Sequence, residues 1–387
     1  MRYVWEPDEA VALLRDWIRT DTCNPPGNEH RLSPALRAFM GKWGIPARIR
    51  DLGGNRSNVE ARLPGIGGGR KLMFCGHLDT VAPWKETAGK YPPHGAAVEG
   101  GRIYGRGASD MKSGLAAMLL AMASLKRDGI RLGGELSFLA TAGEEADSCG
   151  ARAYTEEAGD LELDALVIGE PTGGNIAAGH KGALWLRIAA IGRSAHASMP
   201  EIGRNAVEAM MEATAFLRRL EPEWRVNDPL LGGSSMAFTR IGGGVQTNVI
   251  PDRCELEVDI RVVPPLNAQS LFAQLSAKLE KWSRGMDGIR FVMKPLLVRN
   301  PVRTPTDDPI FRHALDIQGG EAAEIGAVPY YTDASVMQKN GRPPVLIYGP
   351  GEPGQAHQPD EWVGIEAYLQ AIGFYRELAI RYLGVSV

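Results

Sequence analysis

The chain has 387 residues, 44% of them hydrophobic and 23% charged, which is the composition of an ordinary globular protein. Its formal net charge is −3 and it has no long basic run, so a nucleic-acid-binding surface is not expected. A chain of this length exceeds what a single hydrophobic core usually serves, and two domains are predicted.

The cysteines and the apolar segments indicate in which cellular compartment the protein is expected. Cys23, Cys75, Cys149 and Cys254 are scattered without a C-x-x-C pair, which favours a reduced, cytoplasmic environment over a disulfide framework. The acidic N-terminal segment predicts an amphipathic helix and no signal peptide. The longest apolar stretch is about 12 residues against the roughly 20 that span a bilayer, so no membrane segment is expected.

Strands and helices are predicted to alternate over the first half of the chain. Residues 5–45 favour two helices around the loop DTCNPPGNE. The segments that follow read in turn as strand, helix, strand, helix and strand: 70–77, 113–129, 134–143, 151–158 and 164–171. This alternation predicts a parallel or mixed sheet covered by helices.

The pattern changes near residue 180. Four strand-like segments and two helical ones form a βαββαβ-like set, typical of a compact α+β unit: 183–192, 205–221, 235–244, 253–263, 271–282 and 289–295. The alternation of strands and helices then returns, with a helix at 311–320, a strand at 344–349 and a long helix from about Gly364. We therefore expect a discontinuous α/β domain, residues 1–179 and 297–387, with an inserted domain at 180–296.

The segment GPGEPG, from Gly349 to Gly354, matches G-x-G-x-x-G after a strand but does not predict a nucleotide site. Such a site needs backbone N–H donors and a helix opening toward the pyrophosphate. Pro350 and Pro353 lack that N–H, and the following residues start a helix poorly. A tight loop is expected.

Acidic or imidazole side chains follow five apolar or glycine-rich segments, and together they suggest one site. They are His77, Asp110, Glu145, Glu170 and His357. Each alone has a plainer explanation, such as a polar loop at His77 or a helix cap at Asp110. As a set they repeat one pattern, polar ligands where strands end, which is the edge where α/β sheets keep their sites.

This set suits a pair of divalent metal ions. Two imidazoles with three carboxylates favour Zn²⁺ above all, with Mn²⁺ or Co²⁺ as alternatives. Asp110 could bridge two ions about 3.5–4 Å apart, which leaves Glu144 as a general base toward metal-bound water. Asp79 points to the same side of an extended chain as His77, either to support its imidazole or to form an acid–base pair with it. Cys75 is a rival to His77 as a ligand, but it is disfavoured because its place as a small apolar residue inside a strand already explains it.

Seven motifs then occur in a familiar order: HLDTV, GRGASDMKSG, the EE pair, GEPT, RSAHASMPEIGRNA, TNVIPDRCELEVDIR and GPGEPGQAHQPDEW. From about residue 70 to 365 the chain resembles the two-zinc amidohydrolase and peptidase family of acetylornithine deacetylase, succinyl-diaminopimelate desuccinylase, aminoacylase and glutamate carboxypeptidase. The resemblance implies a mixed-sheet α/β/α zinc-hydrolase domain. It also implies that the inserted α+β domain is a lid and the surface of a homodimer.

The resemblance assigns roles by position. His77 and Glu170 match ligands of one zinc ion, Glu145 and His357 ligands of the other, Asp110 the bridging carboxylate, Glu144 the general base and Asp79 the partner of His77. His196 resembles the lid histidine that stabilises the oxyanion, in some members from the partner subunit. Asn248 and Arg261 resemble residues that hold a substrate carboxylate. In two places the chain departs from the family: Pro93 and His94 stand where an aromatic residue is usual, and ADSC, which ends in Cys149, replaces a glycine-rich turn.

The sequence therefore predicts hydrolysis of the amide bond of N-acyl amino acids, with metal-bound hydroxide as nucleophile. The predicted substrate is a small molecule with a free carboxylate, which an arginine such as Arg261 can grip; a salt bridge within the lid explains that residue equally. A dipeptidase or carboxypeptidase is the nearest alternative. An aminohydrolase acting on an aromatic amine, with Trp84, Tyr330 and Tyr331 at its pocket, is another. A paralogue that only binds metal is disfavoured because Glu144 is present.

Overall fold

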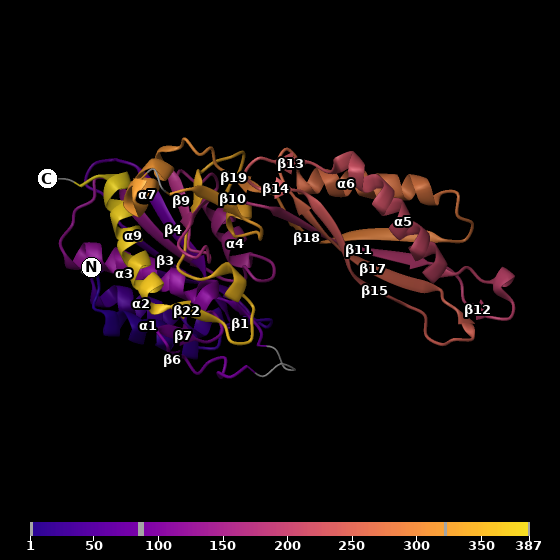
Figure 1. Ribbon diagram of the computed structural model, residues 1–387, viewed down its shortest axis with the longest axis horizontal. Helices are drawn as coiled ribbons and strands as arrows, with labels where there is room; N and C mark the ends of the chain where they lie inside the picture. Colours follow the sequence, from indigo (N-terminus) through magenta and orange to yellow (C-terminus); the bar gives the residue numbers. More distant parts are fainter. Residues whose placement is uncertain (1–2, 84–88, 321–322, 386–387) are drawn as a thin grey trace. The chain divides into compact units, whose positions relative to one another are not determined.

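The computed structural model describes residues 3–83, 89–320 and 323–385, which form two compact units (Figure 1). The first unit comprises the chain up to Gly179, Arg303–Val328 and the part from Thr332 onward. The second comprises His180–Val302 and Pro329–Tyr331. The second unit is thus inserted into the first.

The first unit is built on a mixed sheet flanked by helices. Its helices are α1 (Pro7–Arg19), α2 (Ser33–Lys42), α3 (Ser113–Arg127), α4 (Cys149–Ala158), α7 (Pro309–Gln318), α8 (Ala334–Met337) and α9 (Ile365–Leu383). The strands of the main sheet are β2 (Ala47–Gly53), β3 (Arg56–Leu63), β4 (Lys71–His77), β8 (Glu135–Thr141), β9 (Ala165–Ile168), β10 (Ile176–His180), β19 (Val302–Arg303), β20 (Ile325–Val328) and β21 (Val345–Ile347). Smaller sheets contain β1 (Cys23–Asn24), β5 (Thr80–Val81), β6 (Ala97–Glu99), β7 (Arg102–Tyr104) and β22 (Trp362–Gly364).

The centre of the main sheet is parallel. The strands run in the order β19-β10-β21-β9-β4-β8-β3-β2, and β20 pairs with β10. The neighbours β21, β9, β4 and β8 are parallel to one another, whereas β3 and β2 continue the sheet antiparallel. The central strands are almost wholly apolar and buried because helices cover such a sheet on both faces.

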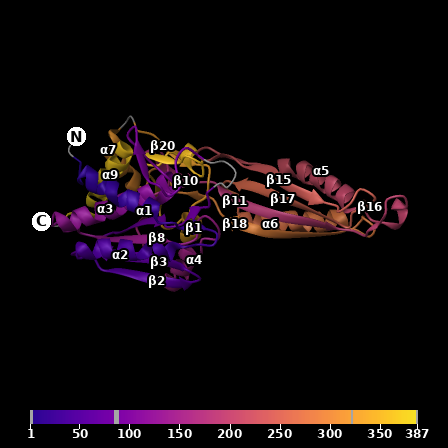
Figure 2. The ribbon, with the colours of Figure 1, turned by 90° about the horizontal axis from the view of Figure 1, so that it is seen from below.

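The helix α3 shows how its sequence decides its position. Residues 113–125 are all buried, and the helix packs against β4 and β8 as well as α1 and α9. A helix that is apolar all round is stable only where it is enclosed. Figure 2 shows α3 close to α1 and α9. This burial fixes the segment just before α3, where Asp110 lies.

The second unit is an antiparallel sheet with helices on one face. Its elements are β11 (Gly182–Ile191), β12 (Ala195–His196), α5 (Ala206–Trp224), β13 (Asn227–Asp228), β14 (Gly232–Gly233), β15 (Ser235–Gly243), β16 (Val249–Ile250), β17 (Arg253–Val262), α6 (Ala268–Ser283) and β18 (Arg290–Arg299). The sheet order is β15-β17-β11-β18, and α5 and α6 lie along it (Figure 1). In β17 buried apolar residues alternate with charged ones, as expected for a sheet covered on a single face.

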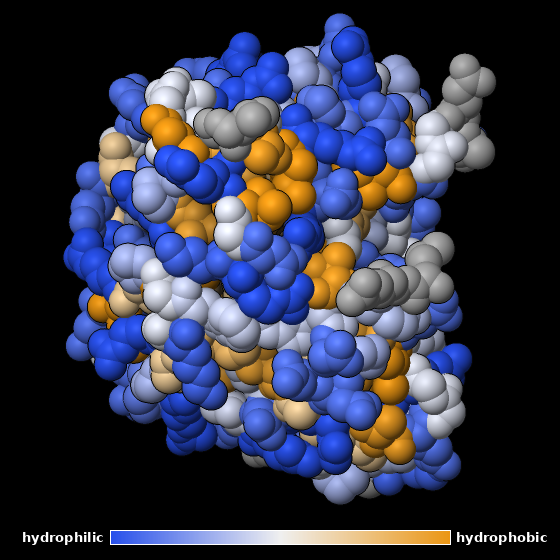
Figure 3. All heavy atoms as spheres, turned by 90° about the vertical axis from the view of Figure 1, so that its left-hand side faces the viewer, coloured by the Kyte–Doolittle hydropathy of each residue, from blue (hydrophilic) through white to orange (hydrophobic). Residues whose placement is uncertain are grey.

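The predicted fold class is confirmed: a mixed sheet with flanking helices and an inserted α+β unit of βαββαβ order. Hydrophilic side chains predominate on the side of the first unit seen in Figure 3, with hydrophobic ones in small groups between them. No helix within the described ranges combines the length and the apolar character needed to cross a membrane.

Candidate metal centre

The four central parallel strands all deliver polar side chains at their carboxyl ends. His77 ends β4, Glu144 and Glu145 follow β8, Glu170 follows β9, and His357 follows β21. The order β21-β9-β4-β8 makes these strands neighbours, so their carboxyl ends meet at one edge of the sheet. This edge lies entirely within the first unit.

Asp110, from the segment before α3, lies between His77, which ends β4, and His357, which follows β21. Its Oδ1 lies 3.1 Å from His77 Nε2, and its Oδ2 lies 3.4 Å from His357 Nε2. The same Nε2 of His77 is 3.6 Å from Glu170 Oε1, and that of His357 is 3.1 Å from Glu145 Oε1. Two ligands of one tetrahedral zinc ion lie about 3.4 Å apart, from Zn–N and Zn–O bonds of about 2.0–2.2 Å. The donor atoms are therefore spaced for two ions that share Asp110.

The imidazole of His77 is oriented as in a metal ligand. Its Nδ1 lies 2.8 Å from the main-chain oxygen of Asp79, which can only accept, so Nδ1 carries the hydrogen. Nε2 is thereby aimed at Asp110 and Glu170. Donation of the second ring nitrogen to a carbonyl or carboxylate is the usual support of a metal-bound histidine.

The charges in this group also favour bound cations. Burial and neighbouring carboxylates raise the pKa of Glu144, Glu145 and Glu170, because negative charges are crowded away from water. Burial would also raise the pKa of Asp110, but hydrogen bonds from His357 and His77 hold it below its usual value. Within the described part of the chain, Glu144 Oε1 is buried without a hydrogen-bond partner. Two divalent ions would neutralise this excess of negative charge, so the residues fit the metals that the sequence predicts.

The carboxylate of Asp79 holds a loop more closely than it holds His77. It is fully buried and lies 3.7 Å from His77 Nδ1, whereas that ring donates its hydrogen bond to the main-chain oxygen of Asp79. Its oxygens accept the amide N–H groups of residues 143, 144 and 145 at 2.9–3.2 Å, and Asn24 Nδ2 at 2.8 Å. Asp79 therefore fixes the main chain of the Glu144–Glu145 pair. Asn24 was not singled out from the sequence, although it lies in the loop DTCNPPGNE.

Glu361 is a second residue that the sequence analysis missed. Its buried carboxylate accepts the amide N–H groups of Gly107, Ser109 and Asp110 at 2.8–3.0 Å and pairs with Arg106 at 2.6 Å. It thus holds the turn that presents Asp110, where a cis peptide bond joins Asp110 to Met111. The sequence offered one sign that Glu361 lies near the site, which is its position four residues after His357 in QAHQPDEW.

The glycines of GPGEPG allow this loop to approach the site. A Cβ at Gly349 would overlap the main-chain oxygen of Glu170, and one at Gly351 would overlap that of Ser109. The end of the motif and Gln355 form only a short turn, Pro353–Gln355, before His357. The loop is tight, as predicted, and packs against two ligand-bearing segments.

His196 and Asn248 are neighbours at one end of the second unit. β12 pairs with β16 there, and Ala197 N donates to the main-chain oxygen of Asn248 at 2.9 Å (Figures 1 and 2). His196 Nδ1 accepts the amide N–H of Ser198 at 3.1 Å, so its Nε2 carries the hydrogen. The exposed ring thus presents an N–H donor.

Arg261 lies in β17 of the four-stranded sheet, at the end of that strand away from β12. It pairs with Asp259 at 2.9 Å and sits opposite Ala183, whereas Arg253 sits opposite Ile191 near β12. Eight residues of strand between Arg253 and Arg261 span about 26 Å. Arg261 and His196 of one chain are therefore too far apart to touch one small substrate.

The remaining side chains from the sequence analysis have other contacts. Tyr331 packs against Trp185 in the second unit, and Trp84 lies outside the described residues. Cys149 begins α4, and its Sγ lies 3.6 Å from the main-chain oxygen of Ala142. His94 lies beside Cys23 in the first unit.

Comparison with known proteins gives consistent relatives. Residues 73–381 match the model of peptidase family M20/M25/M40. A probable succinyl-diaminopimelate desuccinylase of Staphylococcus aureus is 28% identical, over 97% of this chain and 98% of that protein. An acetylornithine deacetylase of Pasteurella multocida is 33% identical, over 86% of this chain and 85% of the relative. An M20 family metallo-carboxypeptidase of Sulfolobus solfataricus has a similar fold, with a TM-score of 0.81 at 20% identity, over 97% of this chain and 99% of that one.

Proposed function

Because this chain belongs to peptidase family M20/M25/M40, a family of metal-dependent hydrolytic enzymes, we propose that it hydrolyses the amide bond of N-acyl amino acids. The observation that carries the proposal is Asp110, whose two oxygens each face a different histidine of one buried carboxylate cluster. The desuccinylase and deacetylase names of the relatives favour an acyl amino acid over a peptide.

The metal ligands divide into two groups that share Asp110. His77 and Glu170 would hold one ion, and His357 and Glu145 the other. When bound, Zn²⁺, or Co²⁺ or Mn²⁺ in its place, supplies Lewis-acid activation of a water molecule and of the amide carbonyl.

Glu144 is the general base of the proposed reaction. It takes a proton from the attacking water and returns that proton to the nitrogen of the leaving amine. Its position supports this role, because its amide is fixed by Asp79 while its buried Oε1 has no hydrogen-bond partner among the described residues.

His196 stabilises the negative charge that develops on the carbonyl oxygen. Ser198 supports this role, because its amide N–H occupies Nδ1 and leaves Nε2 as the donor. Arg261 of one chain would bind the free carboxylate of the substrate by two parallel N–H···O bonds. Asn248, which neighbours His196, would reach the same carboxylate from the other chain. The opposite placement of His196 and Arg261 supports a homodimer, in which each reaction draws one of them from each chain.

The second unit has a surface suited to such a dimer. β15 is an edge strand whose residues 239–243 are exposed, and unpaired edges readily accept another chain. Several large hydrophobic side chains of this unit are also exposed: Met199, Ile202, Met211, Ile241, Val245 and Leu296. We place the enzyme in the cytoplasm, in keeping with four free cysteines.

Release of free amine from a substrate panel tests the proposed function. Metal-free protein would be reloaded with Zn²⁺, Co²⁺ or Mn²⁺ and offered N-acetylornithine, N-succinyl-diaminopimelate, N-acetylmethionine, dipeptides and a folyl-glutamate. Cleavage confined to acyl amino acids is expected. Cleavage of dipeptides or the folate conjugate would make the enzyme a peptidase instead. No cleavage of any amide in the panel would overturn the proposal.

A further inference from the structure

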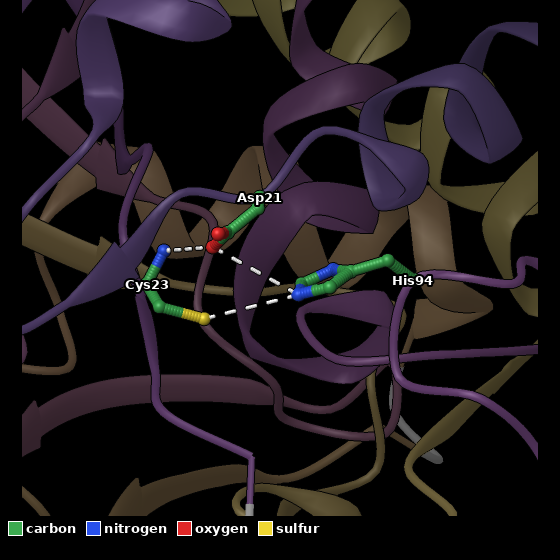
Figure 4. Close-up of side chains that lie close together, drawn as sticks. All are labelled: Asp21, Cys23 and His94. Atoms are coloured by element: carbon green, nitrogen blue, oxygen red, sulfur yellow. Dashed lines mark hydrogen bonds and ion pairs between the residues drawn. The ribbon is translucent and has the colours of Figure 1, made fainter.

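A second group of metal-binding side chains lies in the first unit. Asp21 and Cys23 follow α1, and His94 comes from the loop before β6 (Figure 4). His94 Nε2 lies 4.0 Å from Cys23 Sγ and 3.8 Å from Asp21 Oδ1. None of the three belongs to the catalytic ligand set described above.

The hydrogen bonds of His94 determine what this group can do. Its Nδ1 lies 3.2 Å from the main-chain oxygen of Ile18, which can only accept, so Nδ1 carries the hydrogen. Nε2 therefore directs its lone pair toward Cys23 and Asp21. In a catalytic Cys-His-Asp arrangement the carboxylate would hold the other ring nitrogen. Here sulfur and carboxylate converge on the same nitrogen, which is the arrangement of ligands around one ion.

The distances and the donor types agree with zinc. Bond lengths of about 2.3 Å to sulfur and 2.0–2.2 Å to nitrogen and oxygen put tetrahedral ligands about 3.4–3.6 Å apart. The separations of 3.8 and 4.0 Å are a few tenths of an ångström longer and could close by small side-chain rotations. Thiolate, imidazole and carboxylate are the ligands that Zn²⁺ takes in proteins.

We propose that Asp21, Cys23 and His94 bind a third divalent ion, Zn²⁺, separate from the catalytic pair. Water fills the fourth position, because the side chains of Asp21 and His94 are 42% and 28% exposed. Asp21 remains available, since Arg31 contacts its Oδ2 and the Cys23 amide uses one lone pair of its Oδ1.

The thiol has only weak contacts to give up. Cys23 Sγ lies 3.8 Å from the Val81 main-chain oxygen and 3.7 Å from Thr80 Oγ1. Burial raises the pKa of Cys23 to about 11, so the free sulfur is protonated and releases its proton to solvent when the ion binds. The nearby buried Lys112 opposes the ion by charge, but its ammonium is held by the main-chain oxygens of Trp17 and Thr20.

The ion would stiffen a support of the catalytic site. Asn24 follows Cys23 directly and donates to Asp79, which fixes the main chain of Glu144 and Glu145. A metal ion that joins the segment of Cys23 to the loop of His94 would therefore restrict the movement of Asn24, and with it the hydrogen bonds around Asp79, without itself contacting them. Its role is structural.

Cobalt absorption tests the proposal without any turnover, so its outcome is independent of the proposed reaction. A thiolate bound to Co²⁺ gives a sulfur-to-metal charge-transfer band in the near ultraviolet, whereas the catalytic set has only nitrogen and oxygen donors. Metal-free full-length protein would be titrated with Co²⁺, and zinc counted by mass spectrometry after reloading with Zn²⁺ and desalting. The variants are Cys23→Ala and His94→Ala, with Cys149→Ala as the matched control.

Wild type and Cys149→Ala should show the band and retain one zinc ion more than Cys23→Ala and His94→Ala. His94→Ala alters a partly exposed loop residue, which keeps the test open if Cys23→Ala does not fold. Absence of the band in wild type would overturn the proposal, as would its persistence in folded Cys23→Ala or an equal zinc count in all four proteins.

Discussion

The carboxylate of Asp79 offers the sharpest test of how the metal centre is supported. In Asp79→Asn one oxygen is retained and can still accept two of the four N–H groups that converge on it. The new NH₂ group faces the other two donors, from Glu145 N and Asn24 Nδ2. A rotation of the Asn24 amide recovers one contact, but the Glu145 N–H is left buried without an acceptor.

The expected loss of stability follows from these bonds. A hydrogen bond to a charged group contributes about 1.5–3 kcal/mol, so one or two lost bonds cost between about 1.5 and 6 kcal/mol. Removing a charge close to Glu29 and Asp333, whose pKa values burial and Asp79 both raise, offsets part of this. We expect a net loss of about 3 kcal/mol, against the 5–15 kcal/mol typical of a folded domain, so the variant still folds.

Urea unfolding of metal-free protein measures this loss directly. Asp79→Asn should unfold at lower urea with an unchanged m-value. The control is Asp51→Asn, an exposed residue whose single accepting oxygen asparagine keeps; its change should stay within about 0.5 kcal/mol. Of these two variants, only Asp79→Asn should bind the metal ions more weakly than wild type. A midpoint equal to that of wild type would refute the role assigned to Asp79.

Three further outcomes are expected. Glu144→Gln should lower kcat by about 10²–10⁴-fold with metal content unchanged by mass spectrometry; a wild-type rate would remove Glu144 as the base. His196→Ala should lower kcat by about 10²–10³-fold. Mixing His196→Ala chains with Glu144→Gln chains should restore activity in the mixed dimers. If mixed dimers are shown to form and activity is not restored, His196 acts at the site of its own chain. In chelator, the melting temperature should fall as the pH rises above the ordinary glutamate pKa of about 4.3. The reason is that Glu144, Glu145 and Glu170 have raised pKa values in the folded state, so the stability they contribute is lost as the pH rises through those values. Metal-loaded protein should lack this slope, and parallel slopes in scanning calorimetry would count against a metal site at these residues.

The strands and their polar ends could be predicted because the relevant signals are local. An apolar run such as Leu72–Cys75 is stable only in a covered sheet, and the period-2 alternation of β17 marks a sheet covered on one face. Ligand-type side chains at or after the ends of four such runs predicted one shared edge, and the structure brings His77, Glu145, Glu170 and His357 to it.

The antiparallel strands β2 and β3 at one edge of the sheet were not predicted, because their burial is partial and their pattern weak. Arg261 was left open between a substrate carboxylate and a salt bridge within the lid. The structure has such a salt bridge, to Asp259, two positions away on the same face of β17. The GPGEPG loop had already been separated from a nucleotide site by its prolines, which is again a local argument.

The sequence by itself determined the fold class, since the burial period is written along the chain. It also singled out five ligand-type residues and Glu144 by residue type, and their roles as metal ligands and general base stay predictions. Only the tertiary structure decided which atom faces which. Glu361 reaches the amide of Asp110, Asn24 reaches Asp79, and His94 meets Cys23, across separations of 251, 55 and 71 residues. These contacts connect loops, and a loop sequence has no hydrophobic periodicity from which the orientation of its side chains could be predicted. Their hydrogen bonds become definite only when the packed sheet and α3 fix where each loop begins and ends.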